Sequence, residues 1–150
     1  WFNMLATTGR YEVTDEIKKL LVNDFCAGFC NDSDTKATIH DIYSKYSYTC
    51  DTHTAVAVKV YNDYKAKTSD NTKTLIASTA SPYKFSSSVL EAIEGKIPDM
   101  DEYQMIDHLN GISGYDVPES LAALKNKTKR FNVSIEEDDM KNFVLQNLGL

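Results

Sequence analysis

The stretch Thr74-Leu-Ile-Ala-Ser-Thr-Ala-Ser-Pro-Tyr-Lys-Phe85 decides the fold that we predict for this chain. Residues 75–77 form a short apolar run typical of a buried strand, and Ser78 to Ser81 add hydroxyls at its end. Pro82 cannot donate a ladder hydrogen bond, so the strand should stop there, and a helix signal follows at once. Ligands of open α/β sheets bind at this edge, where strands end.

The neighbouring segments extend this interpretation to a sheet. A strand at Tyr46–Cys50, a helix from about Thr52 to Lys65 and the strand Thr74–Ser78 have the order of a right-handed βαβ unit with parallel strands. The helix is apolar nearly all round, which predicts burial on most of its sides. Phe131, Val133 and Ile135 alternate as a further strand. We therefore predict a three-layer α/β/α fragment with a small, mainly parallel sheet.

Helix starts are marked by residues whose side chains can accept a hydrogen bond from the first free backbone amides. These candidate caps are Thr14, Asn31, Asp51, Ser86 to Ser88, Asp99 or Asp101, and Ser134 paired with Glu137 as a capping box, while Pro118 opens a short helix. Gly95 and Gly111 should close two of the helices.

Composition excludes several classes of function. The 150 residues carry 22 acidic and 16 basic side chains and a net charge of -6, without the basic surface that nucleic acids or anionic membranes require. No apolar run approaches the roughly 20 residues of a membrane span, and the sequence shows no signal peptide pattern, so the default expectation is a cytoplasmic protein. The chain starts at Trp1 within an apolar stretch, which suggests a piece of a longer protein.

The three cysteines, Cys26, Cys30 and Cys50, are predicted to be reduced thiols, because an odd number in a chain of this size argues against a disulfide framework. Cys26 and Cys30 are spaced so that both could face one metal on a helix. There is no C-x-x-C pair and no closely spaced histidine, so we predict no metal site.

Two short segments could carry chemistry. Asp51-Thr-His-Thr54 places a carboxylate, an imidazole and two hydroxyls on a first helical turn, where free backbone amides favour anions. The alternative is that Asp51 is only an N-cap, with neighbours that satisfy the turn. For Thr79-Ala-Ser-Pro-Tyr-Lys-Phe85 the alternative is a connection made of ordinary turn residues.

Three segments together resemble the C-terminal part of threonine synthase: Thr8-Gly-Arg-Tyr-Glu12, Asp51-Thr-His-Thr-Ala-Val-Ala57 and Ser78-Thr-Ala-Ser-Pro-Tyr-Lys-Phe-Ser-Ser-Ser-Val-Leu90. The family usually shows D-P-H-[ST]-A-V for the second segment and T-A-H-P-A-K-F for the third. Thr52 stands here for the usual Pro, Ser81 for the usual His and Tyr83 for the usual Ala. These departures weaken any role tied to those three side chains.

The resemblance implies a pyridoxal-phosphate enzyme of the tryptophan-synthase-like fold type that converts O-phosphohomoserine and water to threonine and phosphate. It places Thr79 beside the pyridine nitrogen of the cofactor. Substrate-site candidates are His53, Lys84, Asp51 and Ser81. The Schiff-base lysine of the family lies upstream of this segment, in the remainder of the same polypeptide, and Lys84 belongs to a different element. We therefore expect these 150 residues alone to bind the cofactor weakly or not at all and to be inactive.

By the same resemblance, residues 1–95 would end the catalytic domain and residues 96–150 would form a helical extension with one strand. Two other functions remain open. The chain could belong to a threonine-synthase-like phospho-lyase with an altered reaction, or it could be a non-catalytic α/β module that binds a partner protein.

Overall fold

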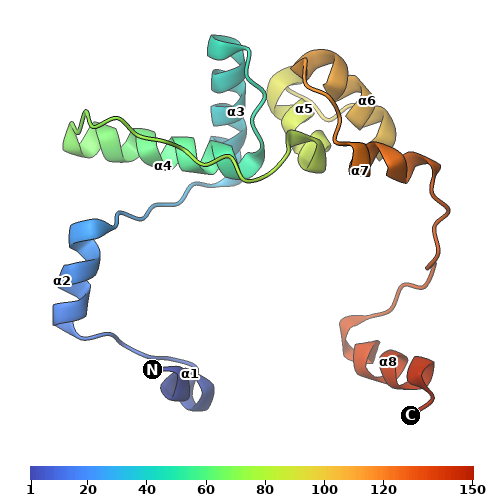
Figure 1. The fold of residues 1–150 in the computed structure, drawn as a ribbon, viewed down its shortest axis with the longest axis horizontal. Helices are drawn as coiled ribbons and strands as arrows, with labels where there is room; N and C mark the ends of the chain where they lie inside the picture. Colours follow the sequence, from blue (N-terminus) through green and yellow to red (C-terminus); the bar gives the residue numbers. More distant parts are fainter. The chain divides into compact units, whose positions relative to one another are not determined.

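The computed structural model describes residues 1–150, and every regular element in it is a helix. The elements are α1 (Phe2–Thr8), α2 (Asp15–Asp24), α3 (Asp32–Tyr46), α4 (Thr52–Thr68), η1 (Pro82–Phe85), α5 (Ser86–Glu94), α6 (Glu102–Ser113), α7 (Glu119–Ala122), η2 (Ala123–Asn126), η3 (Glu137–Asp139) and α8 (Met140–Leu148), as Figure 1 shows. They belong to two compact units, Trp1–Asp116 and Val117–Leu150.

The predicted α/β fold with a mainly parallel sheet is wrong, because the chain contains no strand. Residues 74–78 are extended, but no backbone hydrogen bond joins them to another segment, and Leu75 is 100% exposed. The predicted strand at 46–50 does not form either, and its first residue, Tyr46, belongs to the last turn of α3. Residues 131–135, predicted as a further strand, lie outside any regular element. An apolar, extended segment becomes a strand only when a neighbour supplies the hydrogen bonds of a ladder. No segment of this chain does so.

Most helix starts lie where capping chemistry predicted them. The side chains of Thr14, Asn31 and Asp51 accept hydrogen bonds from amides in the first turns of α2, α3 and α4. Asp101 forms a reciprocal capping box with Gln104 at the start of α6. These caps depend on side chains only two or three residues from the amides that they bind, so the sequence alone reveals them.

Two predicted helix starts are wrong. The capping box of Ser134 with Glu137 does not form: a 3-10 turn occupies Glu137–Asp139, and α8 begins at Met140 without a side-chain cap. The N-cap position of α5 is Phe85, which provides no side-chain hydrogen bond, rather than one of the three serines that follow it.

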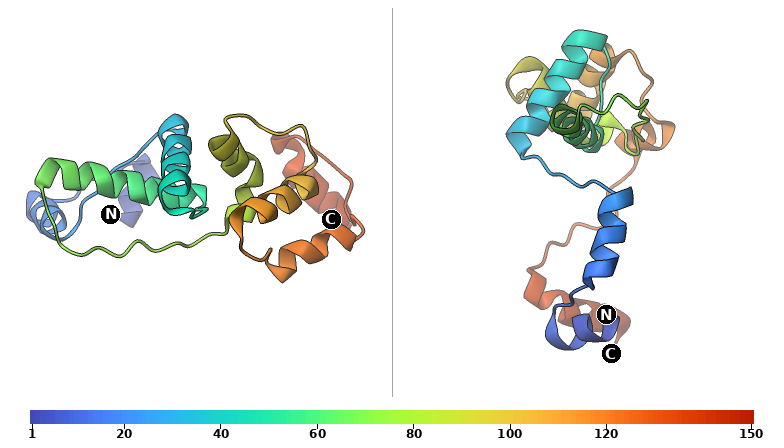
Figure 2. Two further views of the ribbon diagram at one scale, coloured as in Figure 1. Left: turned by 90° about the horizontal axis from the view of Figure 1, so that it is seen from above. Right: turned by 90° about the vertical axis from the view of Figure 1, so that its left-hand side faces the viewer.

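The core of the first unit lies among α3, α4, α5 and α6. Helix α3 packs against both α4 and α5, and α5 packs against α6 (Figures 1 and 2). The fully enclosed apolar side chains are Ile39 of α3, Cys50, Ala55 of α4, Val89 and Leu90 of α5, and Leu109 of α6. Of α4 itself only Thr54 and Ala55 are buried, so the prediction that this helix is buried on most sides is also wrong.

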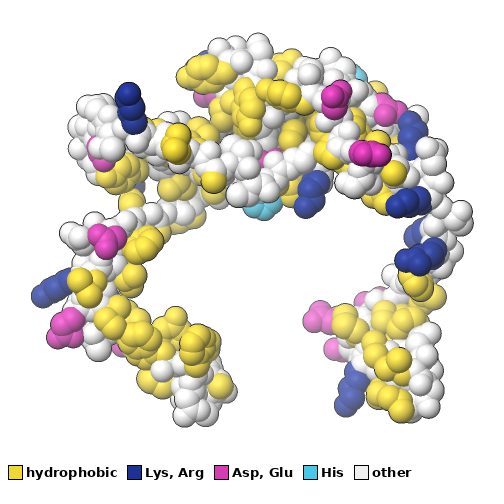
Figure 3. All heavy atoms as spheres, in the orientation of Figure 1, with side chains coloured by type: hydrophobic (Ala, Val, Ile, Leu, Met, Phe, Trp, Pro, Cys, Tyr) yellow, Lys and Arg dark blue, Asp and Glu magenta, His cyan; other side chains and the backbone are white.

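Helices α1 and α2 bury no side chain at all. Of the apolar positions of α2, Ile17 is half-buried, while Leu20 is 68% and Val22 76% exposed, and Figure 3 shows apolar side chains at the surface there. Local backbone hydrogen bonds, together with the Thr14 side-chain cap in α2, rather than full burial, therefore define these two helices. None of the helices in the chain is long and apolar enough to cross a membrane.

The extended segment after α4 runs back along that helix. Residues 74–77 and the α4 side chains of Ala57, Val60, Tyr61 and Tyr64 line one shared hollow. A helix of 17 residues is about 25 Å long, and roughly eight extended residues cover that distance. The path returns the chain to the first turn of α4, where the two segments singled out from the sequence meet.

Candidate functional site at the first turn of α4

Asp51 is a fully buried carboxylate at the N-terminus of α4, with 0% of its surface exposed. Its Oδ1 accepts hydrogen bonds from the amides of His53 at 2.8 Å and Thr54 at 3.3 Å, and its Oδ2 accepts from the Thr54 hydroxyl. Both oxygens are thus occupied by groups of the helix that they begin. Such saturation offsets the cost of removing a carboxylate from water.

The residue before Asp51 is affected by the same environment. Cys50 is 1% exposed, and burial, with a smaller contribution from the charge of Asp51, raises the pKa of its thiol to about 11. The thiol therefore keeps its proton at neutral pH and behaves as a small apolar side chain of the core.

His53 and Phe85 bring together the two segments that carry the resemblance. The imidazole of His53, from the first turn of α4, lies 5.1 Å from the ring of Phe85 between centroids, with 55° between the ring planes. His53 Nδ1 is also 3.4 Å from Asp51 Oδ1, while 64% of the imidazole side chain remains exposed. His53 thus lies between a buried carboxylate and an aromatic face, with one side open to a ligand.

A second contact between the segments lies deeper. Thr54 Oγ1 and Ser78 Oγ are hydrogen-bonded at 3.0 Å, across 24 residues of sequence. Because Thr54 also binds Asp51, the three side chains form a continuous polar series from the buried N-cap to the extended segment.

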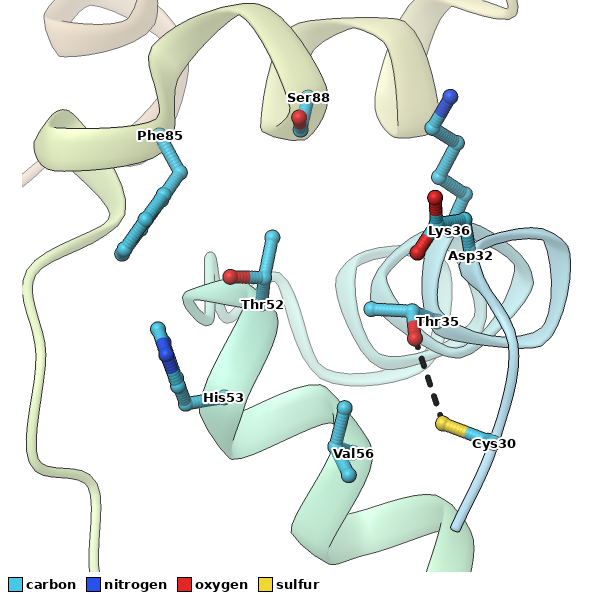
Figure 4. Close-up of a pocket in the computed structure, with 9 residues that line it drawn as sticks. All are labelled: Cys30, Asp32, Thr35, Lys36, Thr52, His53, Val56, Phe85 and Ser88. Carbon is cyan, nitrogen blue, oxygen red and sulfur yellow. Dashed lines mark hydrogen bonds between the residues drawn. The ribbon is translucent and has the colours of Figure 1, made fainter. Parts of the chain in front are cut away.

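The hollow in front of His53 has a volume of about 370 Å³ and is drawn in Figure 4. Its walls come from α3, α4, η1 and α5, and its polar groups include the hydroxyls of Thr52 and Ser88 and the ammonium of Lys36. Lys36 Nζ forms an ion pair with Glu91 Oε2 at 2.7 Å. The lining therefore offers hydroxyl groups, the carboxylate of Asp32 and an ammonium that is already paired with Glu91.

The other predicted site residues lie apart from this hollow. Thr79 is exposed, its hydroxyl has no hydrogen-bond partner within the chain, and it does not line the hollow. Ser81 accepts a 3.4 Å hydrogen bond from the Tyr83 amide and caps η1. Lys84 is exposed and lines a different hollow, beside Glu102. The structure thus places Asp51 next to His53. The other three predicted residues, Thr79, Ser81 and Lys84, do not line this hollow.

Sequence reasoning included the hydroxyls of Thr54 and Ser78 in its two candidate segments but did not foresee their hydrogen bond, and it missed Lys36. The two hydroxyls occur within the quoted motifs, so a search for polar pairs between those motifs could have found this pair. Lys36 lies in α3, outside every motif, and nothing local marks it. No group of three or more His, Cys, Asp or Glu side chains is arranged to hold a metal ion.

Comparison with known proteins identifies the class. Residues 54–144 match the model of the C-terminal region of threonine synthase. The human protein named threonine synthase-like 1 is 31% identical over 101 residues, which is 67% of this chain and 13% of that protein. Threonine synthase of Saccharomyces cerevisiae is 34% identical over 100 residues, which is 63% of this chain and 20% of that enzyme.

The chain belongs to the threonine synthase family and corresponds to its C-terminal portion. It spans about an eighth to a fifth of the length of these relatives. The resemblance derived from the motifs at residues 51–57 and 78–90 is therefore confirmed.

Proposed function

We propose that this chain is the C-terminal part of a pyridoxal-phosphate-dependent threonine synthase, which converts O-phosphohomoserine and water to threonine and phosphate. The observation that carries the proposal is the contact between the two family motifs, made by the rings of His53 and Phe85. The two motifs are separate in the sequence, but His53 of one and Phe85 of the other both line the same polar hollow. Residues of a shared site must meet in this way.

Thr79 is the residue of this chain that we assign to the cofactor. Pyridoxal phosphate, when bound, supplies an electron sink that no side chain can replace. By the resemblance, a hydroxyl lies beside its pyridine nitrogen, and the hydroxyl of Thr79 is exposed and without a hydrogen-bond partner in this chain. A neutral hydroxyl would not hold the nitrogen protonated, which suits elimination and replacement better than transamination. The lysine that carries the cofactor would come from the remainder of the same polypeptide.

His53 is the substrate-site candidate that the hollow favours most. It lines the hollow together with Lys36, whose ammonium would have to leave Glu91 to bind a phosphate group of the substrate. Asp51 is fully buried and would act behind His53 rather than on the substrate. Ser81 and Lys84 remain candidates for contacts from the side of the extended segment. We also propose a cytoplasmic location for the full-length protein.

Release of phosphate from O-phosphohomoserine by the full-length protein tests the proposal. We expect activity that requires pyridoxal phosphate, and a large loss of kcat in Thr79→Val with recovery in Thr79→Ser. Full activity of Thr79→Val would contradict the assigned role of Thr79. A full-length protein that binds the cofactor but forms no threonine would instead support the altered phospho-lyase reaction, for which Thr52, Ser81 and Tyr83 are the departures to reverse.

A further inference from the structure

We infer that Asp51 and Thr54 are positioning residues for Thr79, and that they act through the hydroxyl of Ser78. The inference rests on the proposed function only for the assignment of Thr79 to the cofactor. The positioning itself depends on contacts within this chain: Asp51 Oδ2 accepts the Thr54 hydroxyl, and Thr54 Oγ1 is hydrogen-bonded to Ser78 Oγ at 3.0 Å.

The segment that needs positioning has few other restraints. From Leu75 to Ala80 no backbone group is hydrogen-bonded to another part of the chain, and Leu75 and Thr79 are exposed. The bond between Ser78 and Thr54 is the only hydrogen bond that fastens these six residues to a helix. Since Thr79 is the next residue after Ser78, this bond is the hydrogen-bonded attachment nearest to its backbone. The further restraints are the lining contacts of residues 74–77 along α4 and the hydrogen bonds of Tyr83.

The other end of this series of hydrogen-bonded side chains, at Asp51 and Thr54, is buried. Thr54 is 6% exposed and lies in the first turn of α4; Asp51 is 0% exposed and is the N-cap whose carboxylate binds the amides of that turn. The Asp51 carboxylate fixes the rotamer of Thr54, because its Oδ2 accepts the hydroxyl while its Oδ1 is held by the backbone. The Thr54 hydroxyl is therefore presented to Ser78 in a single orientation, which is how a supporting residue sets the geometry of a site.

Removal of one hydroxyl tests this series. Thr54→Val keeps the shape of the side chain and deletes the hydroxyl, whereas Thr54→Ser keeps the hydroxyl. Ser78→Ala deletes the other partner at a surface position, where loss of folding is not expected. Thr38→Val is the matched control: Thr38 is 8% exposed, against 6% for Thr54, and its hydroxyl donates to the Asp34 carbonyl at 2.7 Å, but it lies within α3 and away from the segment.

The first readout is the backbone order parameter of residues 78–80, from 15N relaxation of this 150-residue chain without cofactor. We expect values to fall below about 0.6 in Thr54→Val and Ser78→Ala, and to stay near those of the unchanged chain in Thr54→Ser and Thr38→Val. The double variant Thr54→Val/Ser78→Ala should show no further loss, because both changes remove the same bond. Unchanged order at Thr79 in both single variants would overturn the inference.

The second readout uses the full-length protein with pyridoxal phosphate. Thr54→Val should shift the absorbance maximum of the bound cofactor and its pH dependence in the same direction as Thr79→Val, with Thr54→Ser restoring both. If Thr54→Val lowers the order of Thr79 but Thr79→Val leaves the cofactor spectrum unchanged, the positioning stands and the proposed role of Thr79 fails. If Thr79→Val alters the spectrum and Thr54→Val alters neither readout, the role of Thr79 stands and the positioning is overturned.

Discussion

The hydroxyl of Tyr83 lies 2.7 Å from Ser113 Oγ and so joins η1 to the C-terminal end of α6. The same hydroxyl is 3.1 Å from Asn110 Oδ1 and also contacts the carbonyl of Tyr115. Tyr83 is only 3% exposed, and it occupies the position where the family usually has Ala. The departure from the family motif therefore has a structural role in this chain, because it fastens the segment that follows Thr79 to the helical core.

Tyr83→Phe should destabilise the first unit by about 1–2 kcal/mol, because a buried set of hydrogen bonds loses its central hydroxyl. The measurement is the free energy of unfolding in urea. Tyr115→Phe is the control, since Tyr115 is 47% exposed and its ring contact with Tyr48 does not involve the hydroxyl. A Tyr83→Phe protein no less stable than this control would show that the hydroxyl set contributes nothing.

Gly28→Ala should be destabilising, because a Cβ atom there would lie 2.7 Å from Val60 Cγ1 on α4. Crowding of this kind typically costs about 1–3 kcal/mol when the neighbours must shift. Gly111→Ala is the matched control: no atom lies within 4 Å of the added Cβ, and Ala in the helix α6 should stabilise by about 0.5–1 kcal/mol.

Thermal unfolding of the two alanine variants gives the comparison. Val60→Ala should rescue Gly28→Ala by removing the crowded methyl groups. If Gly28→Ala and Gly111→Ala change the melting temperature alike, the close packing of residue 28 against α4 is refuted.

Asp51→Ala should cost more than Asn31→Ala, although both remove a side-chain cap. Asn31 accepts one amide hydrogen bond, from Asp34 at 2.8 Å, and a lost cap is typically worth about 1 kcal/mol. Asp51 accepts two amides and a buried hydroxyl, so we expect about 2–3 kcal/mol. Equal losses of unfolding free energy would mean that the bond to Thr54 adds no stability.

Stability should fall between about pH 9 and 11 through Cys50. Burial raises the pKa of this thiol from 9.0 to about 11, so in that range the folded chain keeps a proton that the unfolded chain has released. Stability decreases with rising pH wherever the folded state binds more protons. The contribution is fully present below pH 9 and is lost as the pH rises through the folded pKa.

Denaturation at several pH values measures this effect. The fall assigned to Cys50 should disappear in Cys50→Ala and persist in Cys26→Ala, because Cys26 is exposed. Alkylation of the native chain at pH 8 should likewise modify Cys26 and spare Cys50. Rapid alkylation of Cys50 in the folded state would contradict its burial.

Four capped helix starts and the family were determined by the sequence itself. A capping side chain binds amides two or three residues away, so Thr14, Asn31, Asp51 and Asp101 are visible in the order of residues alone. The motifs at residues 51–57 and 78–90 were sufficient to indicate threonine synthase, because family motifs are likewise short and local.

Only the tertiary structure decided whether the predicted strands pair and which distant side chains meet. Residues 74–78 have the composition of a strand, but a strand also needs a partner at hydrogen-bonding distance, and none of the chain occupies that position. The bond between Thr54 and Ser78 and that between Tyr83 and Ser113 join residues 24 and 30 positions apart. Such contacts depend on the path by which the segment returns along α4, which no local pattern specifies.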